Sequence, residues 1–199
     1  MMQKTPQLYI ISGCNGAGKT TASFTILPKI LDCKEFVNAD EIARGLSPFQ
    51  PEKVAIEAGK IMLRRIDELS KEKTNFAIET TLASKTYKNT ILSAKTNGYN
   101  VTLVYFWLNS VELANERVKT RVKEGGHNID SKVINRRYFA GIKNLFDIYL
   151  PIVDMAIIYD NSTIKHVFVA EKEIEKDIKI IDNKIFNKIL ECYDSTGTK

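Results

Sequence analysis

One stretch of the sequence decides the fold: Leu8-Tyr9-Ile10-Ile11-Ser12-Gly13-Cys14-Asn15-Gly16-Ala17-Gly18-Lys19-Thr20. Residues 8–11 are apolar at every position, which is typical of a strand buried on both faces of a parallel sheet. Residues 13–20 fit the pattern G-x-x-x-x-G-K-[ST] without exception, and this pattern forms a phosphate-binding loop between a buried strand and a helix. The stretch therefore predicts strand, loop and helix in succession, with a nucleoside triphosphate held at the loop.

Each residue type in the loop has a physical purpose. The glycines allow consecutive backbone N–H groups to turn toward phosphate oxygens, and the helix that begins near Lys19 adds the positive end of its dipole. Lys19 is expected to reach the β- and γ-phosphates, and the Thr20 hydroxyl is the predicted ligand of Mg²⁺. The predicted nucleotide-binding residues are Gly13, Cys14, Asn15, Gly16, Ala17, Gly18, Lys19, Thr20 and Thr21.

Cys14 has two interpretations. A thiol beside a helix N-terminus can have a lowered pKa, which would make Cys14 redox-sensitive. The simpler interpretation is a small residue that fills a loop position. The chain has three cysteines in all, scattered and without C-x-x-C spacing, which argues against a disulfide framework and a zinc site and favours a reducing cytoplasm.

The rest of the chain alternates short apolar strands with amphipathic helices, which predicts βαβ units. Further strands are expected at 35–37, 76–78, 101–108 and 155–159, with 101–108 in the centre of the sheet. Helices are expected at 19–30, 52–70, 85–96, 111–124 and 131–149, the last with Ser131 as a cap. Residues 166–169 and 178–181 resemble an edge hairpin, and 184–191 a covering helix.

These elements predict a three-layer α/β fold of phosphate-loop nucleotide-binding proteins. Its mostly parallel five-stranded sheet is followed by a C-terminal β-hairpin and helix. The length of 199 residues and the hydrophobic content of 44% suit one domain with a sizeable core.

The composition argues against two classes of partner. The longest apolar run, residues 101–108, is far short of the roughly 20 residues of a membrane helix, and the short apolar stretch that ends at Ile11 is too short for a signal peptide. The 29 Lys and Arg residues exceed the 24 Asp and Glu residues, but the charges are interleaved instead of forming a basic block. We therefore expect a cytoplasmic protein that binds neither membrane nor nucleic acid, with the surplus charge serving a local anionic ligand.

Polar residues stand at the carboxyl ends of the predicted strands, where ligands bind in parallel sheets. They are Asp40, Glu79, Thr80, Thr81, Asn109, Ser110, Asp160, Asn161 and Ser162. Asp40 and Glu79 could hold Mg²⁺ or accept a proton from an attacking hydroxyl. Each also has a simpler interpretation, Asp40 as a helix cap and Glu79 as a solvated strand end.

Arginines follow in two predicted helices. Arg117 and Arg121 are four residues apart and so share a helix face, and Arg136 and Arg137 come after the break at Gly125-Gly126-His127. Two cationic helices joined by such a loop resemble a lid that brings guanidinium groups onto a γ-phosphate and excludes water. The alternatives are a solvated basic face for each arginine and a structural loop position for the histidine.

An ATPase that only hydrolyses its nucleotide is the competing hypothesis. The predicted strand 155–159 followed by Asp160 resembles a strand with a Mg²⁺-anchoring aspartate. However, Asn161 follows it instead of a glutamate that positions water. The sequence also has neither the serine-glycine-glycine signature of transporter ATPases nor an Asn-Lys-x-Asp guanine-reading segment. A kinase is therefore favoured.

Six motifs carry a family resemblance. They are Gly13–Thr20, Asn38-Ala39-Asp40-Glu41-Ile42-Ala43, Glu79-Thr80-Thr81-Leu82-Ala83, Arg117 through Gly125-Gly126-His127, Arg136-Arg137-Tyr138 and Asp160-Asn161-Ser162. In that order, over about residues 8–162, the chain resembles the zeta toxin family of phosphate-loop kinases, in particular stand-alone relatives labelled predicted ABC-type ATPases or kinases. Two residues depart from the family pattern: Cys14 replaces a proline of many relatives, and Asp130 replaces a lid proline, which is expected to make the lid more flexible.

The resemblance implies a phosphotransferase that uses ATP or GTP with Mg²⁺ and acts on a hydroxyl group of a small molecule. In the family that molecule is UDP-N-acetylglucosamine, and an antitoxin protein holds the enzyme inactive. By position, Asp40 matches the general base, Glu79 a substrate-contacting acid, and Arg121 with Arg136 or Arg137 the lid arginines. A toxin module governed by an antitoxin partner is thus a third hypothesis.

The resulting assignment divides the chain into a zeta-toxin-like kinase domain at 1–163 and a hairpin and helix at 164–199, packed on the same domain. The predicted catalytic residues are Asp40, Lys19, Arg121, Arg136 and Arg137. The predicted substrate-binding residues are Glu79, Thr80, Thr81, Arg117 and His127.

Overall fold

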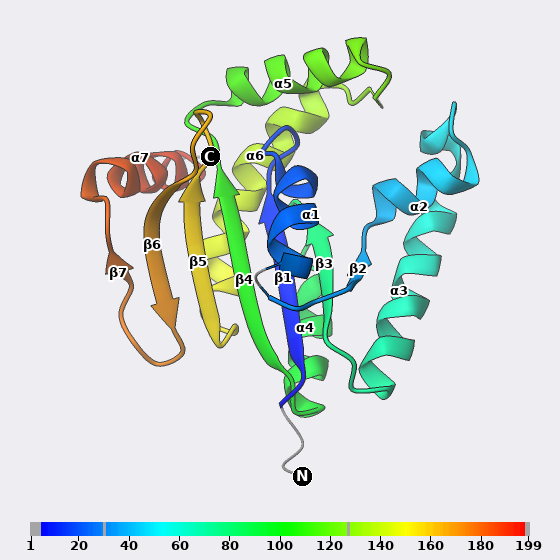
Figure 1. Ribbon diagram of the computed structural model, residues 1–199. Coiled ribbons are helices and arrows are strands. Elements are labelled where there is room, and N and C mark those ends of the chain that lie inside the picture. The colour runs from blue at the N-terminus through cyan, green and yellow to red at the C-terminus, as the bar shows by residue number, and fades with distance from the viewer. Residues whose placement is uncertain (1–4, 30, 127, 198–199) are drawn as a thin grey trace.

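A single twisted sheet forms the middle of the molecule. The computed structural model describes residues 5–29, 31–126 and 128–197, and within them seven strands lie in the order β2-β3-β1-β4-β5-β6-β7 (Figure 1). The first five in that order are parallel: β2 (Glu35–Val37), β3 (Phe76–Thr80), β1 (Gln7–Gly13), β4 (Asn100–Trp107) and β5 (Met155–Asp160). The last two, β6 (Val167–Glu173) and β7 (Lys179–Ile180), are antiparallel.

The predicted α/β fold with a mostly parallel sheet is confirmed, with one correction to the number of strands. The sheet has seven strands instead of five, because the C-terminal hairpin pairs with the parallel strands through β6 and β5. β4 is the fourth of the seven, in the centre as predicted. The division between residues 163 and 164 stays a prediction, and the two sides of it share this sheet.

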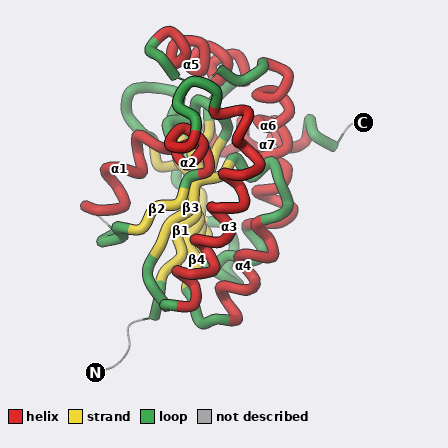
Figure 2. The backbone as a smooth tube through the Cα atoms, turned by 90° about the vertical axis from the view of Figure 1, so that its right-hand side faces the viewer, coloured by secondary structure: helices red, strands yellow, loops and turns green. Residues whose placement is uncertain are grey.

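Helices complete the three layers. Their bounds are α1 (Lys19–Lys29), α2 (Ala39–Leu46), α3 (Ala55–Lys71), α4 (Tyr87–Thr96), α5 (Val111–Lys123), α6 (Ser131–Asn144) and α7 (Asn183–Asp194), with a 3-10 helix at Pro51–Val54 and a π-helical turn at Leu145–Tyr149. Figure 2 shows α1 on one side of the sheet and α3, α4, α6 and α7 on the other. In Figure 1, α5 crosses the top of the molecule, above the carboxyl ends of the parallel strands. Among the described helices, none is long and apolar enough to cross a membrane.

The core forms where the sequence is most apolar. Every residue from 101 to 108 is buried, because β4 has a paired strand on each side and helices over its faces. Residues 8–11 and 76–78 are buried in the same way on the neighbouring strands. Burial on both faces explains why these strands read as continuous apolar runs instead of alternating patterns.

Three local features differ from the prediction. α2 has no counterpart among the predicted helices; Asn38 caps it, with Oδ1 accepting the Asp40 backbone N–H at 2.8 Å. The predicted helix 131–149 ends as an α-helix at Asn144 and continues as the π-helical turn. Its cap is Asp130, whose carboxylate accepts the Lys132 backbone N–H at 2.7 Å, so the assignment of Ser131 was wrong.

Cys14 belongs to the core. Its side chain is only 3% exposed, and burial raises the pKa of its thiol to about 11, with Lys19 and Arg117 too weak to offset this. The interpretation of Cys14 as a low-pKa, redox-sensitive thiol was therefore wrong. A small residue that fills the loop is the interpretation that the geometry supports.

Gly13 is the residue of β1 whose replacement should cost the most stability. Its φ is +139°, and an added Cβ would lie 2.2 Å from the Phe106 carbonyl oxygen. We expect Gly13→Ala to lower the free energy of unfolding by about 3 kcal/mol, as strained backbone and clashes do. Gly59→Ala, inside α3 with open space around it, is the control and should raise it by about 0.5–1 kcal/mol. Urea unfolding that shows equal effects for the two variants would contradict this account of the β1–β4 contact.

The buried thiol predicts an alkaline loss of stability. Because folding raises the pKa of Cys14 from 9.0 to about 11, the native chain keeps a proton that the unfolded chain loses, and the free energy of unfolding falls as pH rises through this window. Each pH unit between the two values costs about 1.4 kcal/mol. When urea unfolding is measured at the two ends of this pH window, the free energy of unfolding should fall by about 2–3 kcal/mol less in Cys14→Ala than in the wild type. An identical decline would refute the assignment.

Candidate active site

Lys19 is a buried lysine at the first position of α1. Its side chain is 7% exposed, and its ammonium donates a hydrogen bond to the Cys14 carbonyl at 3.0 Å. The same nitrogen lies 3.7 Å from Glu79 Oε1 at the end of β3. A buried cation with only partial compensation is a favourable position for the oxygens of a phosphate chain.

The Glu79 carboxylate contacts polar side chains from two other segments of the chain. Oε2 accepts hydrogen bonds from the Thr20 hydroxyl at 2.8 Å and the Asn38 amide at 2.9 Å, in addition to the Lys19 contact. Its side chain is 9% exposed, and burial raises its pKa, although Lys19 and the Thr20 hydrogen bond lower it in part. The interpretation of Glu79 as a solvated strand end was therefore wrong.

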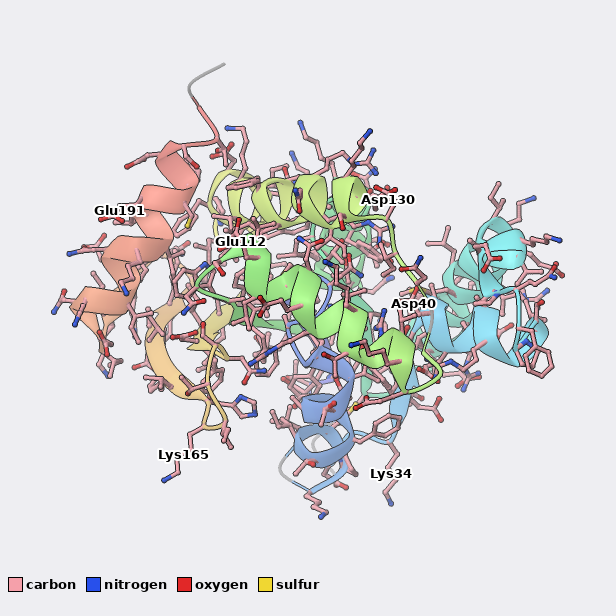
Figure 3. All side chains as sticks on the ribbon, turned by 90° about the horizontal axis from the view of Figure 1, so that it is seen from above. Lys34, Asp40, Glu112, Asp130, Lys165 and Glu191 are labelled. Atoms are coloured by element: carbon pink, nitrogen blue, oxygen red, sulfur yellow. The ribbon has the colours of Figure 1, made fainter. Side chains whose placement is uncertain are left out.

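Asp40 lies in the first turn of α2 and is not its cap. Asn38 performs that function and holds Glu79 with its other amide atom, so one side chain fixes both the start of α2 and the end of β3. Figure 3, which looks down on the carboxyl ends of the strands, places Asp40 at the start of α2. Arg121 and Glu124, at the C-terminal end of α5, line a pocket together with Asp40. The Asp40 carboxylate is exposed and is free to meet a ligand.

Two adjoining pockets meet at these residues. The first, of about 490 Å³, is called the loop pocket here; its lining includes Gly16, Gly18, Thr20, Thr21 and Arg121. The second, of about 420 Å³, is called the β3 pocket; its lining includes Thr80, Thr81, Ser84, Tyr87 and Arg136. The residues that line both are Asn15, Lys19, Ala39, Asp40, Glu79 and Arg137. The shared wall thus carries two cations and two carboxylates between the two spaces.

The predicted lid arginines occupy different positions. Arg117 donates to the carbonyls of Gly16 at 3.5 Å and Ser162 at 3.2 Å, and so lies at the loop pocket. Arg137 donates to Asn15 Oδ1 at 3.3 Å and lines both pockets, whereas Arg136 is exposed and lines only the β3 pocket. His127, predicted to contact the substrate, lies outside the described residues.

Asp160, at the end of β5, and the two residues after it support the loop instead of lining the loop pocket or the β3 pocket. Asp160 Oδ1 accepts the Ser162 backbone N–H at 2.8 Å and also the Ser162 hydroxyl. The Asn161 amide donates to the Ala17 carbonyl at 2.7 Å, and the Ser162 hydroxyl accepts the Asn109 backbone N–H at 2.8 Å. The Asp160 carboxylate is thus used in a turn, which argues against the Mg²⁺-anchoring function of the ATPase hypothesis.

The donor set of the loop pocket fits Mg²⁺ carried in with a nucleotide. Mg²⁺ takes oxygen ligands and keeps several waters, so one or two protein oxygens suffice beside phosphates. The Thr20 hydroxyl and the Glu79 carboxylate, 2.8 Å apart, supply such oxygens. Among the described residues no cluster of three or more His, Cys, Asp or Glu side chains could bind a metal ion without the nucleotide.

Some lining residues were not predicted from the sequence. Asn38 was part of a family motif but was assigned no function from the sequence. Glu41, three residues later, makes with it a capping-box pattern that predicts the start of a helix. Ser84 and Tyr87 line the β3 pocket because the chain turns back after β3 into α4. No local pattern signals such a position, since it depends on how α4 and α6 pack.

Comparison with solved structures identifies the same fold. The structure of AvrRxo1-ORF1:AvrRxo1-ORF2 with sulphate ions has a TM-score of 0.76 at 18% identity, over 93% of this chain and 63% of the matched chain. A Streptococcus pneumoniae structure from the PezAT chromosomal toxin-antitoxin system has a TM-score of 0.67 at 18% identity, over 100% and 90%. The chain therefore spans less than two thirds of the first of these proteins and most of the second.

Sequence comparison gives the family. An uncharacterized protein of Haemophilus influenzae is 34% identical over 128 residues, which cover 63% of this chain and 88% of that protein. The family model described as zeta toxin matches residues 1–175, which include the phosphate loop, Asp40, Glu79 and all four predicted arginines. The chain belongs to the zeta toxin family, with the fold of phosphate-loop kinases.

Proposed function

We propose that the protein is a kinase that transfers the γ-phosphoryl group of ATP or GTP to a hydroxyl group of a small molecule. The observation that carries the proposal is the position of Asp40, which lines both the loop pocket and the β3 pocket. A nucleotide in the loop pocket and an acceptor in the β3 pocket would meet at this carboxylate. The family resemblance implies a UDP-sugar such as UDP-N-acetylglucosamine as the acceptor.

Asp40 serves as the general base in this mechanism. Its carboxylate takes the proton of the acceptor hydroxyl as that oxygen forms a bond to the γ-phosphorus, and the bond to the bridging oxygen of the nucleoside diphosphate breaks. The carboxylate is exposed, so an acceptor hydroxyl can approach it from the β3 pocket. The products are the phosphorylated acceptor and the nucleoside diphosphate.

The cations of the shared wall stabilise the transferred group. Lys19 and Arg137 line both pockets, so each can face the γ-phosphoryl oxygens from a different side. Arg121 lines the loop pocket only and adds positive charge above the phosphate chain. Thr20 and Glu79 would hold Mg²⁺ bound with the nucleotide, which would further neutralise the phosphate charge.

A protein partner is a second part of the proposal. The two similar structures reported above come from a complex of two open reading frame products and from a toxin-antitoxin system. Their names support an antitoxin that binds this chain. The three cysteines are free, and the cytoplasmic location stays a prediction.

Asp40→Asn tests the base assignment. Loss of the proton acceptor should lower phosphoryl transfer by about 100–10,000-fold while the exposed position leaves the fold intact. Phosphorus NMR with UDP-N-acetylglucosamine, other sugar nucleotides, nucleosides and small metabolites measures the transfer. Glu41→Gln, which removes a carboxylate from the same turn and lines only the loop pocket, is the control. Unchanged transfer in Asp40→Asn would refute the base, and hydrolysis of ATP without any acceptor product would favour the ATPase.

Two neighbouring arginines should separate catalysis from acceptor binding. Arg137→Ala removes a cation from the shared wall and should lower kcat by about a thousandfold. Arg136→Ala touches only the β3 pocket and should raise the KM for the acceptor about tenfold with a smaller change in kcat. Steady-state kinetics with ATP and acceptor varied separately measures both. The reverse pattern would contradict the assignment of the pockets.

A further inference from the structure

The segment after β3 forms one wall of the β3 pocket and has an unusual backbone. Thr80, Thr81, Ala83 and Ser84 line the pocket, and Leu82 between them has a φ of +57°. This left-handed conformation is unfavourable for a residue with a Cβ. The Leu82 side chain is fully buried, so the segment cannot relax without exposing it. Something outside the segment must therefore hold it in place.

Contacts within the segment satisfy only its N–H groups. The Thr80 hydroxyl oxygen accepts the Leu82 backbone N–H at 3.1 Å, and the Thr81 hydroxyl oxygen accepts the Ala83 backbone N–H at 3.4 Å. Residues 81–84 follow Thr80, the last residue of β3, so they lie beyond the bounds of the strand. Carbonyl groups that are shielded from water there need donors from elsewhere in the fold.

The end of α6 and the π-helical turn supply these donors. The Asn144 amide donates to the Leu82 carbonyl at 2.7 Å, and the Tyr149 hydroxyl donates to the Ser84 carbonyl. Both side chains are buried, Asn144 at 6% and Tyr149 at 0% exposure. The π-helical turn at Leu145–Tyr149 adds a residue to the helix and so sets the direction of Tyr149, a feature that often marks functional sites.

Gly141 allows the close approach that these bonds require. A Cβ added there would lie 2.6 Å from the Thr81 carbonyl oxygen, so only glycine lets α6 reach the segment. The same helix lines the β3 pocket with Arg136, Arg137 and Ala140 on its preceding turns. Helix α6 thus carries the two arginines of the β3 pocket and also contacts the segment after β3 that supplies the pocket's hydroxyl groups.

We propose that Asn144 and Tyr149 are positioning residues that hold residues 81–84 in the conformation that binds the acceptor. The inference rests on the proposed function of the β3 pocket and adds to it a determinant of acceptor affinity. Neither residue lines the pocket, so both act through the backbone of the segment. Nucleotide binding in the loop pocket does not depend on them.

Asn144→Leu and Tyr149→Phe test the proposal against Tyr138→Phe as the matched control. Tyr138 lies on the same helix, is buried, and donates to the Leu108 carbonyl at 2.7 Å, away from residues 81–84. Each variant removes a hydrogen bond from a buried side chain to a backbone carbonyl, and Tyr138→Phe also removes the contact of its hydroxyl with Cys192 Sγ at 3.8 Å. Urea unfolding should therefore show that the control loses at least as much stability as the two test variants. The two test variants should raise the KM for UDP-N-acetylglucosamine about tenfold while the KM for ATP changes less than about twofold, and the control should change neither.

Hydrogen exchange provides a readout that needs no acceptor. Amide exchange at Leu82 and Ala83 should accelerate about tenfold or more in the two test variants and stay at the wild-type rate in Tyr138→Phe. Unchanged exchange at these amides, or equal changes in all three variants, would overturn the proposal. If the wild type transfers phosphate to no acceptor, the proposed function fails, and the exchange result alone decides whether α6 holds the segment.

Discussion

The site depends on one buried carboxylate at the end of β3. Glu79 meets Lys19 and Thr20 from the phosphate loop and α1, and Asn38 from the start of α2. A buried carboxylate is stable only when its oxygens are hydrogen-bonded or paired, so these partners are required by the burial itself. The carboxylate therefore fixes the distance between the loop that receives the nucleotide and the helix that carries Asp40.

This constraint explains why two pockets share one wall. The Asn38 amide nitrogen donates to Glu79, and its amide oxygen accepts the first backbone N–H groups of α2. The Asp40 carboxylate in this first turn is not needed as a cap and is exposed. On the opposite side, α6 packs against the segment after β3 and presents Arg137 to the loop at Asn15. Charges for phosphate and a base for a hydroxyl proton are thereby held on rigid elements instead of loops.

The features that could be predicted from the sequence depend on local patterns of residues. The phosphate loop sets its own conformation through its glycines, and the parallel order of β1, β3 and β4 brings Glu79 and Thr80 to the loop's end of the sheet. α2 escaped prediction because it has eight residues, includes Gly45, and is followed by Pro48, so its apolar pattern is short. Its capping-box start at Asn38 was the available signal.

The remaining features depend on contacts between distant segments. Asp160 resembled a metal ligand at a strand end, yet its carboxylate accepts hydrogen bonds from the backbone N–H and hydroxyl of Ser162, two residues later. The periodicity of residues 131–149 predicts one continuous helix, whereas the chain continues after Asn144 as a π-helical turn, in which the Tyr149 hydroxyl donates to the distant Ser84 carbonyl. An edge hairpin was predicted, but its antiparallel pairing with β5 depends on a contact that the local sequence pattern does not indicate.

The proposed function requires that a phosphoryl group passes directly from nucleotide to acceptor beside Asp40. ATP labelled with oxygen-18 at its non-bridging γ-oxygens, incubated with the protein, Mg²⁺ and UDP-N-acetylglucosamine, tests it by mass spectrometry of the products. Direct transfer should yield a phosphorylated sugar nucleotide that carries all of the labelled oxygens, because the acceptor's own oxygen forms the new bond. Inorganic phosphate as the only labelled product, formed beside unlabelled ADP and with the sugar nucleotide unchanged, would contradict transfer to this acceptor and show hydrolysis in its place.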